Sequence, residues 1–67
     1  MIYRLNAPQE CTFEQIKLLV QQIPVATTLL DLSHNDLNRF SASELVALFK
    51  LIPSTVLALD LRDNGFG

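Results

Sequence analysis

The chain has 67 residues, enough for one domain, and a domain this small buries only about 60% of the surface of its unfolded chain. Hydrophobic residues make up 49% of the sequence and charged residues 18%, which is too apolar for intrinsic disorder, and the single cysteine excludes both an intrachain disulfide and a cysteine-rich zinc site. The net charge of −2 argues against nucleic-acid binding, and no apolar run approaches the roughly 20 residues of a membrane span.

The hydrophobic pattern predicts elements that alternate between strand and helix. Alternating apolar and polar side chains are typical of half-buried strands, and apolar residues spaced i, i+3, i+4 and i+7 are typical of one helix face. Thr12 with Gln15, and Ser41 with Glu44, have the spacing of a capping box at a helix start. In chain order the sequence predicts a degenerate strand near 1–5, a helix near 12–22, a strand near 28–33, a helix near 41–51 and a strand near 57–62.

The sequence repeats itself with a period of 29 residues. The stretch 30–37 reads LDLSHNDL and the stretch 59–66 reads LDLRDNGF. Carried back to the start of the chain, this offset places Met1 and Tyr3 where the later units have strand leucines, and Asn6 where they have an asparagine. We therefore expect one domain made of three units, 1–29, 30–58 and a truncated 59–67.

Strands joined by helical crossovers run parallel, with the helices on one face of the sheet. Alternate strand residues then point at the helices and form the core. The predicted core comprises Leu30, Leu32, Leu59 and Leu61, closed at its far end by Leu37 and Phe66. Buried amides of Asn6, Asn35 and Asn64 should bond to backbone groups that the turns leave unpaired, and so form a ladder from unit to unit.

The pattern LxLxxNxL, with a 29-residue period and a helix in each unit, resembles the ribonuclease-inhibitor-like leucine-rich repeats. The run 52–56 followed by 59–64 looks like the repeats of bacterial leucine-rich-repeat effector proteins from intracellular pathogens. The resemblance covers essentially the whole chain, and it is specific for the fold and unspecific for function. It implies an α/β leucine-rich-repeat solenoid of about two and a third repeats, with parallel strands on the concave face and helices on the convex face. Met1, Tyr3 and Pro8 depart from the pattern by replacing leucines, which suggests a starting unit.

Such repeats generally serve as protein-binding scaffolds, so the resemblance implies a protein–protein interaction with an unidentified partner and no catalysis. In stacked repeats the exposed sheet face is the usual binding surface. The candidate partner-binding residues on that face are Arg4, Asp31, Ser33, His34, Asp60, Arg62 and Asp63.

Three features invite a chemical interpretation, and each has a stronger structural one. His34 is the only histidine, and an exposed turn residue is favoured over a metal or proton site because no nucleophile or pocket is signalled. Cys11 is favoured as a small buried hydrophobe over a nucleophile. Asp31 and Asp60 share a repeat position, and a solvated face of mixed charge is favoured over an acid/base pair or a cation site. We expect no enzyme, no cofactor and no metal.

The C-terminal end of the array has features of a contact surface. The second helix carries Val46 and Leu51 where the first carries Lys17 and Gln22, and the third strand leaves an unpaired edge. The candidate self-association residues are Val46, Lys50, Leu51 and Phe66. The alternative function is therefore a self-assembling, engineered or truncated repeat module whose open C-terminal end forms a homo-oligomer.

The first residues of the chain do not have the pattern of a signal peptide. We expect a protein that is cytoplasmic in the producing cell, or that is secreted into a host cell, as the resemblance to effectors implies. Neither a membrane nor a nucleic acid is expected as a partner.

Overall fold

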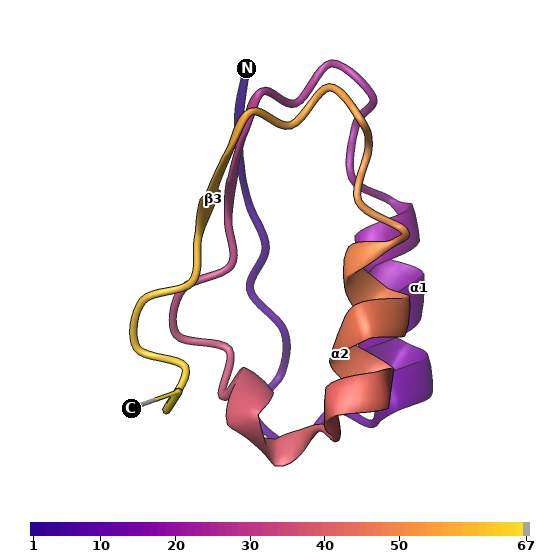
Figure 1. Ribbon diagram of the computed structural model, residues 1–67, viewed down its shortest axis with the longest axis vertical. Coiled ribbons are helices and arrows are strands. Elements are labelled where there is room, and N and C mark those ends of the chain that lie inside the picture. The colour runs from indigo at the N-terminus through magenta and orange to yellow at the C-terminus, as the bar shows by residue number, and fades with distance from the viewer. Residues whose placement is uncertain (67) are drawn as a thin grey trace.

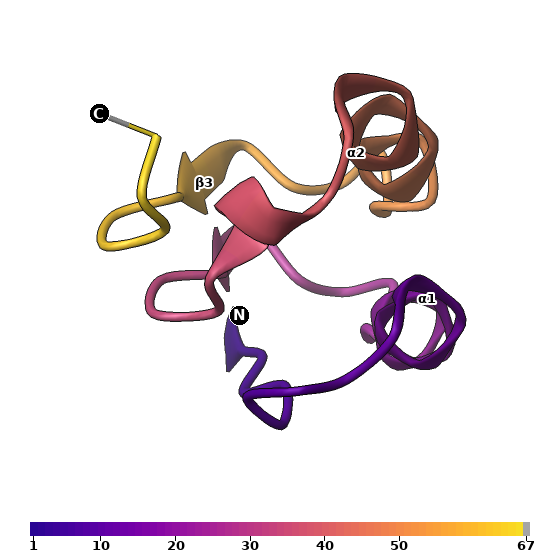
Figure 2. The ribbon, with the colours of Figure 1, turned by 90° about the horizontal axis from the view of Figure 1, so that it is seen from below.

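The computed structural model describes residues 1–66, in which three parallel strands alternate with two helices in one sheet (Figure 1). In chain order the elements are β1 (Ile2–Arg4), α1 (Phe13–Gln21), β2 (Leu29–Asp31), the short 3-10 helix η1 (Leu37–Arg39), α2 (Ala42–Phe49) and β3 (Ala58–Asp60). Both α-helices lie on the same side of the sheet, and α2 stands beside α1 (Figure 2). The predicted order of strands and helices is confirmed.

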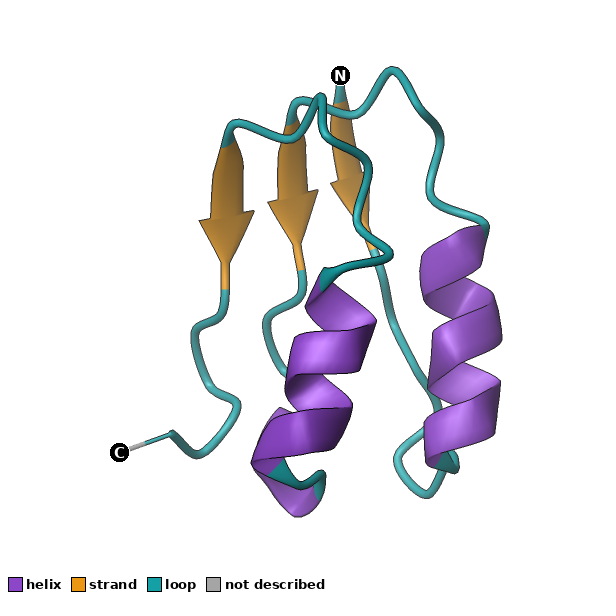
Figure 3. Ribbon diagram, turned by 45° about the vertical axis from the view of Figure 1, so that its right-hand side comes forward, coloured by secondary structure: helices purple, strands orange, loops and turns teal. Residues whose placement is uncertain are grey.

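The strands lie in the order β1-β2-β3, and each adjacent pair is parallel (Figure 3). Leu30 of β2 pairs with Leu59 of β3, so this step has the 29-residue offset seen in the sequence. On its other side Leu30 pairs with Tyr3, an offset of only 27 residues. Tyr3 and the buried Leu5 therefore occupy the places of the strand leucines, and the prediction that Met1 and Tyr3 do so is wrong.

The shorter offset arises in the connection between β1 and α1. The helix cap Thr12 follows Tyr3 by nine residues, whereas Ser41 follows Leu30 by eleven. The longer connection contains η1, which has no counterpart in the first unit. As a result Asn6 is exposed on the surface, and its predicted place in the asparagine ladder is wrong.

Both α-helices begin with the capping box that the sequence predicts. The Thr12 hydroxyl accepts from the Gln15 N–H at 3.2 Å, and the Gln15 side chain accepts from the Thr12 N–H at 2.9 Å. Ser41 and Glu44 make the same two bonds at 3.2 and 3.0 Å. Each box satisfies two backbone donors that a helix start leaves unpaired, which contributes about 1 kcal/mol.

The hydrophobic core fills the space between the sheet and the helices, and it is tightest around the middle strand. The buried apolar residues are Leu5, Cys11, Ile16, Val20, Ile23, Leu30, Leu32, Leu37 and Leu48. Leu59 and Phe66, expected in the core, are instead 40% and 50% exposed, because no described strand lies beyond β3. Within residues 1–66 no helix is long and apolar enough to span a bilayer.

Candidate interaction surface

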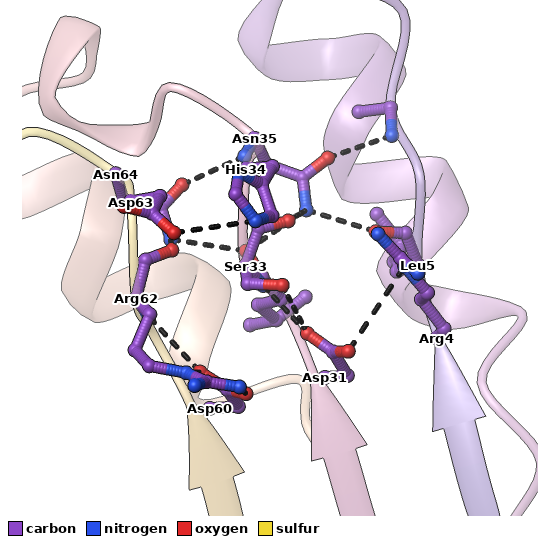
Figure 4. A network of polar contacts seen from close by, with 12 residues as sticks. Arg4, Leu5, Asp31, Ser33, His34, Asn35, Asp60, Arg62, Asp63 and Asn64 are labelled. Atoms are coloured by element: carbon purple, nitrogen blue, oxygen red, sulfur yellow. Dashed lines mark hydrogen bonds and ion pairs between the residues drawn. The ribbon is translucent and has the colours of Figure 1, made fainter.

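The sheet face turned away from the helices, called here the open face, carries a row of charged side chains (Figure 4). Arg4, Asp31 and Asp60 occupy one register position on the three strands. The Arg4 Nε lies 4.0 Å from an Asp31 oxygen. The predicted pairing of Asp31 with Asp60 across the two strands is thus confirmed, and Arg4 extends the same row on β1.

Each of the two aspartates is held by the residue two positions after it in the chain. Asp31 accepts from the Ser33 N–H at 2.9 Å and from the Ser33 hydroxyl. Asp60 accepts from the Arg62 N–H at 3.1 Å, and the Arg62 guanidinium grips it through Nε at 3.0 Å and Nη2 at 2.8 Å. An aspartate side chain that bonds the backbone two residues on forms an Asx-turn, which explains why aspartate ends both strands.

These hydrogen bonds lower the pKa of both carboxyl groups. The Ser33 hydroxyl and then the Ser33 N–H lower the pKa of Asp31, and the Arg62 guanidinium and then its N–H lower the pKa of Asp60. A carboxyl group whose pKa is lower in the folded chain stabilises the fold above its unfolded pKa of about 4. That contribution is lost as the pH falls through the folded-state pKa, so acid weakens the turns that end β2 and β3.

Replacing Ser33 with alanine is expected to raise the pKa of Asp31 and to leave the pKa of Asp60 unchanged. Alanine removes the hydroxyl donor that contributes most to the shift and keeps the backbone donor. The measurement is a carboxyl-carbon NMR titration of both aspartates. Arg62→Ala is the matched variant and should raise the pKa of Asp60 instead; equal responses of both aspartates to either change would contradict this assignment.

Beyond the strand ends, His34 and Asp63 lie side by side on two equivalent turns. His34 Nε2 is 3.2 Å from an Asp63 oxygen, and both side chains are more than half exposed. Both residues have a left-handed backbone, with φ of 61° and 58°. The hydrogen-bonded ladder continues here, because the His34 N–H donates to the Arg62 carbonyl at 3.1 Å. The turns therefore hold these two side chains at a fixed separation, and the exposed position predicted for His34 is confirmed.

A hollow of about 480 Å³ opens beside this pair, and its lining is mainly polar. It is lined by Ala7, Gln9, His34, Asn35, Asp36 and Asp63. Two carboxylates and one imidazole at its rim suit a basic or hydrogen-bonding side chain of a partner. The described residues contain no group of three or more histidine, cysteine, aspartate or glutamate side chains close enough to hold a metal ion.

Two buried asparagines support the turns from below. The Asn35 amide donates to the carbonyls of Leu5, Leu32 and Ser33 at 2.8, 2.9 and 3.1 Å, and its oxygen accepts from the Ala7 N–H at 2.7 Å. The Asn64 oxygen accepts from the N–H groups of Asn35 and Leu37 at 2.9 and 3.2 Å. Each asparagine thus satisfies backbone groups of the preceding unit, which confirms the predicted ladder from Asn35 onward.

Arg39 is a further residue that ties two units together. Its guanidinium donates to the Asn35 carbonyl at 2.9 Å and to the Cys11 carbonyl at 3.0 Å, and it lies 3.1 Å from the Cys11 sulfur. Cys11 is 5% exposed, so its predicted role as a small buried residue is confirmed. The sequence does not indicate this role of Arg39, because its hydrogen-bond partners lie up to 28 residues away in the sequence.

The structure brings together six of the seven predicted partner-binding residues. Ser33 is the exception: it is 4% exposed, and its hydroxyl is used by Asp31, so the prediction that it lies on the surface is wrong. The residues that remain on the open face and its turns are Arg4, Asp31, His34, Asp60, Arg62 and Asp63.

The predicted self-association residues do not all lie on one side. Val46 and Phe66 are about half exposed and Lys50 is exposed, whereas Leu51 is half-buried and packs on the core. Leu51 has the repeat position of Gln22, which lines a hollow formed by the first unit alone. On α2 that side faces α1, so the prediction that Leu51 belongs to the open end is wrong.

Comparison of the chain with protein-family models, with curated proteins and with solved structures gave no match in any of the three.

Proposed function

We propose that the chain is a short leucine-rich-repeat solenoid that binds another protein through the open face of its sheet. The observation that carries the proposal is the row of oriented charges on that face, in which Ser33 holds Asp31 and Arg62 holds Asp60. Side chains that are already fixed lose less conformational entropy on binding. The parallel strands and the 29-residue step from β2 to β3 support the repeat architecture, in which stacked units share one binding face.

The charges on the open face define the kind of partner. Arg4 lies on β1 and Arg62 follows β3 directly, while Asp36 and Asp63 lie at the rim of the hollow beyond the strand ends. A surface with both signs in fixed places favours a partner with the complementary pattern and disfavours others through like-charge contacts. The effector-like pattern of 59–64 supports a host-cell protein as that partner, reached by secretion from the producing cell. The proposed activity is binding without catalysis.

A displayed peptide library selected on the whole chain tests the proposal. Selected peptides should bind a face variant, Arg4→Ala with His34→Ala and Arg62→Ala, more weakly by about tenfold or more, which is about 1.4 kcal/mol. These three side chains are more than half exposed, and Asp60 keeps the backbone N–H of residue 62 when the guanidinium is removed, so the variant should fold.

The matched control changes charges on the helices, Glu14→Ala with Lys50→Ala, and should leave binding unchanged. Both of these side chains are exposed on the other side of the molecule. Peptides that bind the face variant as tightly as the parent chain, or that lose affinity only for the helix variant, would overturn the proposed binding face.

A further inference from the structure

The outer edges of β1 and β3 have no strand paired with them in the described part of the chain, and the outer side of β3 is incompletely buried. Among residues 1–66 only β2 has a strand on both sides. Leu59 is 40% exposed, although Leu30 at the same repeat position is fully buried, and Leu61 is half-buried where Leu32 is 1% exposed. An unpaired strand edge with apolar neighbours is a template for another strand.

The strand ladder shows which backbone bond is missing at this edge. The Leu5 N–H donates to the Asp31 carbonyl at 3.0 Å, and the Leu32 N–H donates to the Asp60 carbonyl at 2.9 Å. At the equivalent position on β3, no acceptor for the Leu61 N–H is found in the described part of the chain. The chain's own pattern therefore specifies a parallel strand whose carbonyl occupies the position of Asp31 and Asp60.

The flank of α2 beside β3 is also exposed, on the same side of the molecule as the unpaired edge of β3. Val46 is 54% exposed, and a separate groove of about 300 Å³ is lined by Phe49, Ile52 and Leu59 among others. The equivalent flank of α1 is covered by α2 within the chain. We call the surface formed by Val46, Phe49, Leu59, Asp60 and Leu61 the β3 edge.

The opposite side of the molecule carries a matching set of groups. Arg4 has the register position of Asp31 and Asp60, and its side chain is 58% exposed. A hollow of about 530 Å³ formed by the same unit includes Leu18, Leu19 and Gln22 in its lining. We call the surface formed by Arg4, Leu18, Leu19 and Gln22 the β1 edge.

We propose that the β3 edge of one copy pairs with the β1 edge of a second copy, so that the sheet continues from chain to chain. In this register Leu59 lies beside Tyr3 of the second copy, and the Leu61 N–H donates to the Arg4 carbonyl of the second copy. Asp60 then faces Arg4 of the second copy, an opposite-charge neighbour like the Arg4–Asp31 pair within the chain. Val46 packs over the apolar hollow of the β1 edge.

Charge and geometry favour this head-to-tail joint over a joint between two β3 edges. Only the head-to-tail joint repeats a contact already present in the chain, the parallel packing of β3 and α2 on β2 and α1. Two β3 edges related by a two-fold axis would pair antiparallel, unlike β2 and β3, and Asp60 would meet a second Asp60–Arg62 pair in place of Arg4. A head-to-tail contact is heterologous, so it leaves both outer edges free and permits further growth.

One part of the internal contact is missing from the joint, and this limits its strength. Within the chain, Asn64 caps the N–H groups of Asn35 and Leu37 in the unit before it. At the corresponding register position the first unit has Pro8, which offers no side-chain acceptor. The joint is therefore weaker than the contact between units of one chain, and association depends on protein concentration.

Two complementary variants of the full chain test the joint by light scattering. The first blocks the β1 edge with Arg4→Glu and Gln22→Lys; the second blocks the β3 edge with Val46→Lys and Asp60→Asn. Asparagine keeps a side-chain oxygen for the Arg62 N–H, and lysine near a helix C-terminus is favourable. Far-UV circular dichroism checks that both variants fold.

The parent chain should rise in mass above 7.5 kDa with concentration, without stopping at a dimer. Each variant alone should stay at the monomer mass, and an equal mixture should double in mass, because each variant keeps one intact edge. Self-association of the β1-edge variant alone would indicate paired β3 edges and overturn the proposal. A parent chain that stays monomeric, or a mixture that does, would also overturn it. The readout needs no outside partner, so a failure of the joint is distinguishable from a failure of the proposed binding face, with which the joint shares Arg4.

Discussion

Replacing Asn35 with alanine is expected to unfold most of the chain, whereas replacing Asn6 is expected to leave its stability unchanged. Asn35 is 4% exposed, and alanine would leave the Leu5 carbonyl and the Ala7 N–H without a side-chain partner, whereas the Leu32 carbonyl keeps the Asn64 amide at 3.0 Å. Each buried polar group left unsatisfied costs about 1–3 kcal/mol, so the loss from these two groups is about 2–6 kcal/mol. A domain of this length has only about 3–10 kcal/mol in total.

The measurement is urea unfolding followed by circular dichroism, with both variants made in the same chain. Asn6 is exposed, so Asn6→Ala is a matched control that differs from Asn35→Ala only in position. Surface changes of this kind stay within about 0.5 kcal/mol. Comparable losses for the two variants would mean that Asn6 belongs to the ladder, and would restore the uniform 29-residue offset in place of the observed 27-residue step.

The elements of the fold could be predicted because their signals are local. The capping boxes at Thr12 and Ser41 start the helices at the expected residues, and the strands fall inside the expected ranges. Each strand is only three residues long, shorter than expected, and β2 and β3 end where the Asp31 and Asp60 side chains bond the backbone two residues on. Local periodicity identifies the type of an element better than its length.

The register of the first strand could not be predicted by sliding the sequence by one constant period. The connection after β1 lacks the two residues that accommodate η1 after β2. A signal for the correct register was nevertheless present. The triplet Tyr3-Arg4-Leu5 has a charged residue between two apolar ones, as Leu30-Asp31-Leu32 has. In the structure β1 pairs with β2 in the register that aligns these two triplets. Repeats should therefore be aligned strand on strand and helix on helix, and not over the whole unit.

The candidate surface was predictable in its position and not in its internal bonds. Alternation along a strand assigns Arg4, Asp31 and Asp60 to one face, and the structure confirms this. The same alternation also assigned Ser33 to that face, where the Asx-turn after Asp31 instead buries it. Once a strand ends, side-chain bonding to the backbone replaces alternation as the rule for which residues are exposed.

Replacing Leu30 with alanine is expected to cost far more stability than the same change at Leu59. Leu30 is fully buried at the middle of the core, so its loss should cost about 3–5 kcal/mol through lost burial and the cavity that remains. Leu59 has the same repeat position, yet it is 40% exposed. Its replacement should cost only about 1 kcal/mol in dilute solution, since much of its surface is already in water.

The two leucines also report on the joint between chains. If a second copy covers the β3 edge, Leu59 gains burial only in the assembled state, so the cost of Leu59→Ala should increase with protein concentration. The cost of Leu30→Ala should not change in this way, because its neighbours on both sides belong to one chain. Urea unfolding at low and high protein concentration measures both. A cost at Leu59 equal to that at Leu30 in dilute solution would mean that the third strand is packed as tightly as the second, and that its outer edge is not open.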